Sequence, residues 1–187
     1  MPTPPRPAEA FVSVDIEAAG PSPSRYALLA IGACLVADPE RGFYAELRPW
    51  SLQADPEAMA VHGLSLDTLA RDGEEPAVAL VRLEEWLAAE LPDARPVFVG
   101  FNAPFDWMFV ADAFHRYLGR NPFGYAALDI KSLYTGLRGV DWADANWERI
   151  AARYGLPDSL PHNALADARL QARLFATLFE EARRRDR

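Results

Sequence analysis

Four acidic side chains and one histidine are of the types that build a metal-dependent hydrolytic site. They are Asp15, Glu17, Asp106, His162 and Asp167. Each carboxylate stands where an apolar element starts or stops, and a charge in such a place needs a partner. Divalent cations suit this role, since hard cations such as Mg²⁺ take oxygen ligands and two of them can clamp the attacking and leaving oxygens of a phosphodiester. The residue types therefore predict a metal-dependent nuclease.

The spacing on each element supports a shared site. Asp15 and Glu17 are two apart on an expected strand, so their side chains leave on the same face. Asp106 and Asp167 each fall in the first turn of an expected helix, on its apolar side. The alternative is that both aspartates only stabilise helix N-termini through the macrodipole, but such residues usually face solvent. We therefore expect all four carboxylates to converge as metal ligands.

Three segments carry these residues: Phe11–Gly20, Asn102–Asp106 and His162–Asp167. In order and spacing they resemble the DEDDh exonuclease family, which includes ribonuclease T, oligoribonuclease and the proofreading subunit of bacterial replicative DNA polymerase. The resemblance runs from about Phe11 to about Phe179. It implies a hydrolase that removes nucleotides from 3' ends, a 3'-5' exonuclease.

The apolar pattern predicts an α/β fold. Strands are expected at 11–16, 27–37, 43–47, 97–101 and 126–130. Helices are expected at 65–70, 76–91, 104–118, 131–137, 146–154 and 164–184. Short connections favour an antiparallel meander of the first three strands, and a strand–helix–strand crossover adds parallel strands. The resemblance implies a ribonuclease H-like fold with this mixed five-stranded sheet flanked by helices.

The chain is expected to hold one exonuclease domain at residues 11–182. Residues 1–10 contain four prolines and no hydrophobic segment, so we expect a flexible N-terminal tail rather than a signal peptide. Residues 183–187 form a basic C-terminal tail that continues the last helix, with contact to RNA as the less favoured reading.

Composition limits the class of protein and its location. The net charge of −8 argues against a broad basic binding surface, although a small nuclease pocket remains compatible with it. The single cysteine, Cys34, lies in an apolar run and is expected to be a buried hydrophobe in a reducing compartment, hence a cytoplasmic protein. No apolar run approaches the roughly 20 residues of a membrane helix, so no membrane partner is expected.

His162 lies five residues before Asp167 in an expected loop and helix cap. A neutral imidazole there could accept a proton from the attacking water. The related DEDDy branch carries a tyrosine four residues before the last aspartate, where this chain has Asn163, so the chain resembles the histidine branch. His115 is expected to be an inert residue on a helix surface.

Four further residues are expected to contact substrate. The family often has a His-Gly-aliphatic segment lining the nucleotide pocket, which here corresponds to His62 and Leu64. Phe105 is expected to stack on a base. Many relatives have threonine where this chain has Ala18, which keeps the main-chain contact but loses a hydroxyl. Asp129 resembles a fifth ligand, yet a helix-cap role is favoured.

We expect two Mg²⁺ or Mn²⁺ ions. Asp15, Glu17 and Asp167 are assigned to the ion that activates water, with Asp15 bridging to a second ion held by Asp106. His162 would deprotonate the nucleophile, and nucleoside 5'-monophosphates would be released one at a time from single-stranded ends.

The sequence leaves RNA and DNA open as substrates, and with them RNA trimming and DNA proofreading. It predicts a freestanding enzyme or a small subunit, with a homodimer or an association with a polymerase as the possible assemblies. A different class is a nucleic-acid-binding module that kept this fold and lost catalysis. The intact set of five residues argues against that class.

Overall fold

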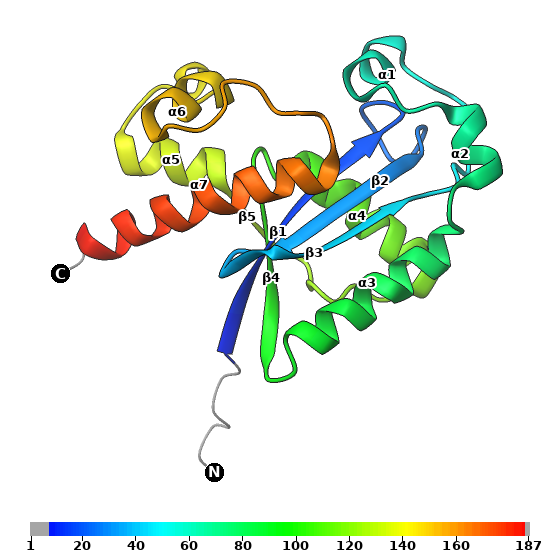
Figure 1. Cartoon of the computed structure of the whole chain (residues 1–187), viewed down its shortest axis with the longest axis horizontal. Coiled ribbons are helices and arrows are strands. Elements are labelled where there is room, and N and C mark those ends of the chain that lie inside the picture. Colours follow the sequence, from blue (N-terminus) through cyan, green and yellow to red (C-terminus); the bar gives the residue numbers. More distant parts are fainter. Residues whose placement is uncertain (1–7, 186–187) are drawn as a thin grey trace.

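The computed structural model describes residues 8–185, which form a mixed sheet covered by helices (Figure 1). The strands are β1 (Ala8–Ala18), β2 (Leu28–Leu35), β3 (Asp38–Glu46), β4 (Ala94–Gly100) and β5 (Ala127–Asp129). They lie in the order β3-β2-β1-β4-β5. β1, β2 and β3 pair antiparallel, while β4 pairs parallel with both β1 and β5. The predicted meander with added parallel strands is confirmed.

Helices lie on both faces of this sheet. They are α1 (Pro56–His62), α2 (Leu66–Asp72), α3 (Pro76–Glu90), α4 (Pro104–Leu118), α5 (Ile130–Arg138), the 3-10 helix η1 (Trp142–Asp144), α6 (Trp147–Tyr154) and α7 (Ala164–Arg185). α7 crosses one face in contact with β1 to β4, while α3 and α4 cover the other face (Figure 1). α5 and α6 pack beside α7 in a common hydrophobic cluster. Within the described residues, no helix is long and apolar enough to cross a membrane.

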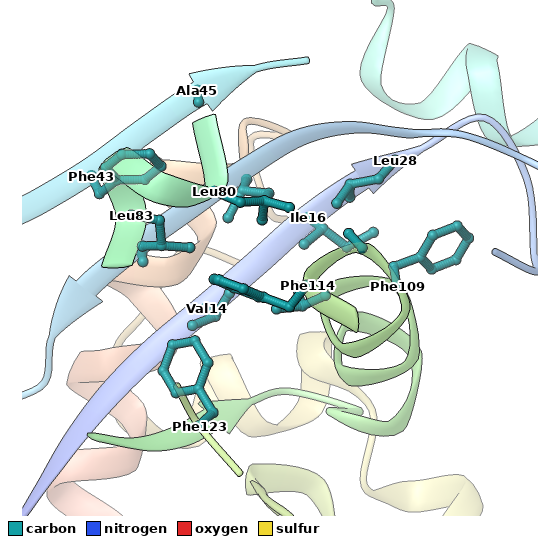
Figure 2. Close-up of a cluster of buried hydrophobic side chains, with 14 of the residues drawn as sticks. Val14, Ile16, Leu28, Phe43, Ala45, Leu80, Leu83, Phe109, Phe114 and Phe123 are labelled. Atoms are coloured by element: carbon teal, nitrogen blue, oxygen red, sulfur yellow. The ribbon is translucent and has the colours of Figure 1, made fainter. Parts of the chain in front are cut away.

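Alternation along β1 separates the core from the polar site. Val14 and Ile16 point toward α3 and α4, where they meet Leu83, Phe109 and Phe114 in a closely packed cluster (Figure 2). The residues between them in the sequence point to the opposite face, because successive side chains of a strand alternate. One strand therefore carries both a wall of the core and the first two acidic residues.

Small residues let α7 begin very close to the sheet. A Cβ at Gly32 of β2 would lie 2.1 Å from the backbone carbon of Ala164, so only glycine fits there. Ala164 and Ala168 are fully buried on the contacting side of α7, and Ala168 packs on the buried Cys34. The start of α7 is therefore fixed against β2.

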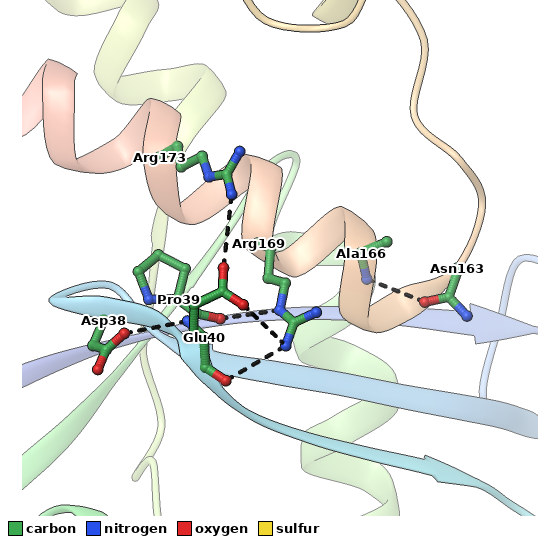
Figure 3. A network of polar contacts seen from close by, with 7 residues as sticks. All are labelled: Asp38, Pro39, Glu40, Asn163, Ala166, Arg169 and Arg173. Carbon is green, nitrogen blue, oxygen red and sulfur yellow. Dashed lines mark hydrogen bonds and ion pairs between the residues drawn. The ribbon is translucent and has the colours of Figure 1, made fainter.

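Polar contacts fasten the middle of α7 to the hairpin between β2 and β3 (Figure 3). Arg169 Nε donates to the carbonyl oxygen of Pro39 at 3.0 Å. Arg169 and Arg173 also form ion pairs of 3.9 and 3.8 Å with Glu40. Each of these exposed ion pairs contributes little free energy. We therefore assign them a role in setting where α7 lies along the β2–β3 hairpin rather than in stabilising the fold.

Some boundaries differ from the prediction. β1 begins at Ala8, because residues 8–10 pair with residues 94–96 of β4, so the expected end of the tail at residue 10 is wrong by three residues. The rest of that expected tail lies outside the described residues. At the other end α7 continues through Arg185, into the range expected to be the C-terminal tail.

The helix α1 was missed. It has no buried residue, and so no apolar stripe marks it in the sequence. Its signals are local: Asp55 is the N-cap, Pro56 occupies the first turn, and Gly63 ends the helix in the left-handed conformation with a φ of 68°.

Candidate active site

Three of the predicted ligands meet at the carboxyl end of β1. Asp15 and Glu17 point to the α7 side of the sheet, and Asp167 projects from the first turn of α7. Ligand oxygens from these three side chains all lie within 4.8 Å of one another. Ligands of open sheets commonly bind at the carboxyl ends of strands where the strand order reverses, and β1 is such a position here.

The first turn of α7 sets the position of Asp167. Asn163 caps the helix: its Oδ1 accepts the N–H of Ala166 at 3.1 Å (Figure 3), and its carbonyl accepts the N–H of Asp167 at 2.9 Å. Asp167 is 2% exposed, and its Oδ1 has no hydrogen-bond partner within the described residues. A buried carboxylate oxygen without a donor is costly, which indicates a site meant for a cation.

Asp106 approaches the site from the face of the sheet that α4 covers, at the point where β1 and β4 diverge. The parallel pairing of these strands ends at Ser13 and Val99, while β1 continues to Ala18. The N–H of Ile16 is thereby left without a strand partner, and Asp106 Oδ1 accepts it at 3.1 Å. Asp106 is 4% exposed and lies beside the group of three carboxylates rather than within it.

Burial and mutual repulsion oppose ionisation of the acidic residues. Burial raises the pKa of Asp15 well above its usual range, and the charges of Asp106 and Asp167 add to this effect. Burial, with the charge of Asp167 next, raises the pKa of Glu17 to about 7. Full ionisation of Asp15 and Glu17 is therefore unfavourable near neutral pH unless a cation offsets their charges.

The same cause acts on the two helix aspartates. Burial raises the pKa of Asp106 to about 8, although the bond from the Ile16 N–H acts in the opposite direction. Burial raises the pKa of Asp167 to about 6, opposed first by the nearby His162. Four carboxyl groups with raised pKa values in one place are typical of a functional site. A divalent cation, which prefers oxygen ligands, matches this set.

The two histidines of the site come from different elements. His162 is exposed, lies just before α7 and has a φ of 55°, unusual for a residue with a side chain. His162 directly precedes Asn163, the N-cap of α7, and so lies at the same helix start as Asp167. The predicted place of His162 beside the last aspartate is thus observed, whereas its role as a base stays a prediction.

His62 fastens the end of α1 to β1. The N–H of Leu64 donates to His62 Nδ1 at 3.1 Å, so the proton of the neutral ring resides on Nε2. Nε2 lies 3.3 Å from the carbonyl oxygen of Ala18 and donates to it. Burial lowers the pKa of His62, which favours this neutral form. His62 therefore has a positioning role, in addition to the substrate contact that the sequence predicts.

The remaining expected substrate residues also lie around the end of β1. Ala18 is 5% exposed and directly follows Glu17. Leu64 packs on a small cluster that includes Leu69. Phe105 is half-buried, with its ring 5.3 Å from that of Phe109. The fold brings these residues to the site, and their contact with substrate stays a prediction.

Asp129 and Gln171 hold the turn between β4 and α4. Asp129 is the N-cap of α5, as predicted, and its Oδ1 also accepts the N–H of Ala103 at 2.9 Å. Gln171 was not singled out in the sequence. Its Oε1 accepts the N–H of Phe101 at 2.9 Å and its Nε2 donates to Asp15 Oδ1 at 2.6 Å. The sequence feature that could have indicated Gln171 is its amide side chain, which lies one helical turn after Asp167 on the apolar stripe of the expected last helix. His115 is exposed on α4, as predicted.

Comparison with known proteins identifies the family. The description "3'-5' exoribonuclease Rv2179c-like domain" matches residues 10–179. The 3'-5' DNA exonuclease Cap18 of Escherichia coli is 48% identical over 168 residues, which cover 89% of this chain and 90% of that protein. This chain belongs to the 3'-5' exonucleases. The exonuclease is also 31% identical over 179 residues to a ribonuclease T of Marinobacter nauticus, covering 88% of this chain and 79% of the relative.

Solved structures show the same fold. The nuclease domain of 3'hExo, a DEDDh family member bound to rAMP, superposes with a TM-score of 0.75 at 15% identity, covering 92% of both chains. Escherichia coli exonuclease I in complex with a 5cy-dT13 oligonucleotide gives a TM-score of 0.71 at 19% identity over 95% of this chain and 42% of that one. The exonuclease therefore has the ribonuclease H-like fold and the DEDDh resemblance that the sequence predicted. An inactive binding module gains no support.

Proposed function

We propose that this exonuclease hydrolyses single-stranded 3' ends in a reaction that requires divalent cations, and that it releases nucleoside 5'-monophosphates. The observation that carries the proposal is the group of Asp15, Glu17 and Asp167, whose ligand oxygens lie within 4.8 Å of one another. Their raised pKa values and the unpartnered Oδ1 of Asp167 mark a site that is unfavourable without a cation.

The acidic residues divide into two groups. Asp15, Glu17 and Asp167 would hold one Mg²⁺ or Mn²⁺, and Asp106, which lies outside this group of three, would hold a second. When bound, such ions lower the pKa of water and stabilise charge on the phosphate. The protein supplies the geometry: β1 and the close start of α7 fix three carboxylates, while the Ile16 N–H orients the fourth.

We assign the general base to His162. Water attacks phosphorus, the bond to the departing 3' oxygen breaks, and the imidazole accepts the proton that water loses. Solvent returns a proton to the 3' oxygen. The exposed position of His162 beside Asp167 lets the ring meet the substrate and then exchange its proton with bulk water.

The terminal nucleotide would occupy the space between α1 and the start of α4. Ala18 offers its main chain, His62 and Leu64 form one wall, and Phe105 provides a ring for base stacking. We propose DNA as the preferred strand, because the relative at 48% identity is a DNA exonuclease. RNA is the second candidate, supported by the ribonuclease T relative at 31% identity.

Assembly and location are further proposals. A homodimer, an association with a polymerase and a cytoplasmic location rest on the sequence alone. The free and buried Cys34 accords with a reducing compartment.

The test is hydrolysis of 5'-labelled single strands of DNA and RNA with equal sequence, each with Mg²⁺, with Mn²⁺ and with EDTA. We expect a ladder of single-nucleotide steps with either ion, none with EDTA or with Asp15→Asn, and resistance of a 3'-phosphate end. Undiminished cleavage in excess chelator would disprove the metal requirement. Cutting of a circular single strand would contradict exonucleolytic action.

A further inference from the structure

A lysine and an exposed tryptophan form a pair beyond the carboxylates. Lys131 Nζ lies 4.1 Å from the centroid of the Trp142 ring. Trp142 belongs to η1 and is 53% exposed. Lys131 is the only lysine of the chain and lies in the first turn of α5. An exposed ring with a cation over it matches what single-stranded nucleic acid requires, a platform for a base and a charge for a phosphate.

The stability of α5 does not account for a lysine at this position. A cation in the first turn of a helix opposes the helix dipole, so Lys131 is unfavourable for α5 itself. Asp129 already caps the helix through the Ser132 N–H at 2.8 Å. Within residues 8–184, Lys131 forms no ion pair, in contrast to Arg116, which covers Trp50 but is bonded to Asp112.

Most other cations are neutralised. Among the described basic side chains, those without an ion pair are Arg25, Arg95, Lys131, Arg153 and Arg183. A protein with a net charge of −8 repels a polyanion, so an unpaired cation near the site has a disproportionate effect on binding.

Asp129 connects the start of α5, which carries Lys131, to the loop that leads to Asp106. Asp129 ends β5 and accepts the N–H of Ala103, three residues before Asp106. Two residues further on, Lys131 therefore stands at the carboxyl end of β5. β5 follows β4 and β1 in the sheet, so the ends of these three strands form one continuous edge.

The opposite side of the site is closed by α1, which His62 fastens to Ala18. In Figure 1 the start of α7 lies between α1 on the right and α6 on the left. A strand whose 3' end lies under α1 can continue across the end of β4 toward the end of β5. That course leads it to α5 and η1.

We infer that Lys131 and Trp142 form an upstream subsite for single-stranded nucleic acid, where a base stacks on the exposed indole and the ammonium group contacts a phosphate. The inference rests on the proposed function, because it takes the 3' end to lie at Asp15. The subsite binds without sequence preference, since every base has a stacking face and every nucleotide has a phosphate. It makes longer strands better substrates than short ones.

The experiment measures kcat and KM on a series of oligothymidylates from two to twelve nucleotides, with oligouridylates as a parallel series. Lys131→Ala and Trp142→Leu are compared with the wild type. Arg95→Ala removes an unpaired cation at the far end of β4, and Trp50→Leu removes an exposed tryptophan that an ion-paired arginine covers. Melting temperatures of all variants confirm folding.

For the wild type we expect KM to fall with length. Trp142→Leu should raise KM on long strands by about fivefold or more, the usual worth of one stacked base, with kcat unchanged. Lys131→Ala should make log(kcat/KM) less steep against log salt by about 0.7, the value for one phosphate contact on a single strand. Lys131→Arg should restore the slope, and the shortest strands should be unaffected.

Two results would overturn the subsite. One is that Lys131→Ala and Trp142→Leu match their Arg95 and Trp50 controls at every length. The other is an equal loss on the shortest and longest strands, which would place the effect at the reaction centre. If the wild type hydrolyses no strand with Mg²⁺ or Mn²⁺, the proposed function fails instead. The two failures are therefore distinguishable.

Discussion

Gln171 Nε2 donates to Asp15 Oδ1 at 2.6 Å, while Gln171 Oε1 accepts the N–H of Phe101 at 2.9 Å. Because a backbone N–H can only donate, the amide has one possible orientation, with its NH₂ group toward Asp15. Gln171 is 1% exposed and cannot exchange these bonds for water. Gln171 of α7 thus links Phe101, the residue after β4, to Asp15 of β1.

Gln171→Met should weaken metal binding and activity by about 10–100-fold, the usual loss when a partner of a ligand is removed. The volume is kept, so the fold should persist, but Asp15 loses the donor that orients it. Calorimetric titration with Mn²⁺ checks the affinity separately from turnover. An unchanged affinity with reduced kcat would show that Gln171 acts on substrate rather than on the ligand, and Gln53→Met on the surface serves as control.

The metal-free protein should lose stability as pH rises from about 5.5 to 8.5. Folding raises the pKa of Asp167 to about 6, of Glu17 to about 7 and of Asp106 to about 8. The folded state therefore binds more protons than the unfolded chain, and the stability present at low pH is lost as pH rises through these values. Melting temperatures in EDTA measure this trend. Added Mg²⁺ or Mn²⁺ should raise the melting temperature more at pH 8.5 than at pH 5.5, because protons compete with the ion.

Asp167→Asn should separate stability from function. The amide removes one of the interacting charges, so the metal-free variant should melt at a higher temperature than the wild type at pH 8 and depend less on pH. Activity and metal affinity should both fall, since a ligand charge is lost. A variant that melts lower than the wild type in EDTA would show that the repulsion between carboxylates is already relieved without a metal.

His162→Ala should lower kcat by about 10²–10⁴-fold and leave metal affinity nearly intact, because the imidazole moves a proton whereas the carboxylates hold the ions. His115→Ala, on the exposed surface of α4, is the matched control and should be silent. Single-turnover rates and calorimetry on both variants test this division. Full activity of His162→Ala would place the general base elsewhere and refute the histidine-branch interpretation.

The sequence predicted the parts of the site that follow from periodicity. The spacing of Asp15 and Glu17 requires a shared face once the segment is a strand, and Asp106 and Asp167 lie on apolar helix faces. The buried faces of α4 and α7 agree with this pattern. These predictions depend on repeats of two and 3.6 residues, which the chain carries explicitly.

What the sequence did not predict depends on contacts between distant segments. The position of Asp106 in the site depends on the point where β1 and β4 stop pairing. No local sequence pattern predicts that point. Gln171 gains its role only when Phe101 lies opposite. α1 has no apolar stripe, because it covers the end of β1 without burying a side chain of its own.

Gly32→Ala should damage the site from a distance. The new Cβ would lie 2.1 Å from the carbon and 2.3 Å from the oxygen of Ala164, which are backbone atoms that cannot rotate away. The start of α7 must then move off β2, and it carries Asp167 and the preceding His162 with it. We expect a loss of about 1–3 kcal/mol in unfolding free energy, as for an overpacked core. Activity should fall further than this instability explains, since misplacement by about 1 Å can reduce rates about 10²-fold.

Gly136→Ala provides the control for Gly32→Ala. Gly136 lies within α5, and a Cβ there would meet nothing within 4 Å. Alanine should therefore stabilise the helix by about 0.5–1 kcal/mol without changing activity. Chemical denaturation gives the unfolding free energies, and single-turnover rates at saturating Mn²⁺ give the activity of the folded fraction. If Gly32→Ala retains the wild-type rate per folded molecule, α7 can retreat from β2 without moving Asp167, and the close approach serves packing alone.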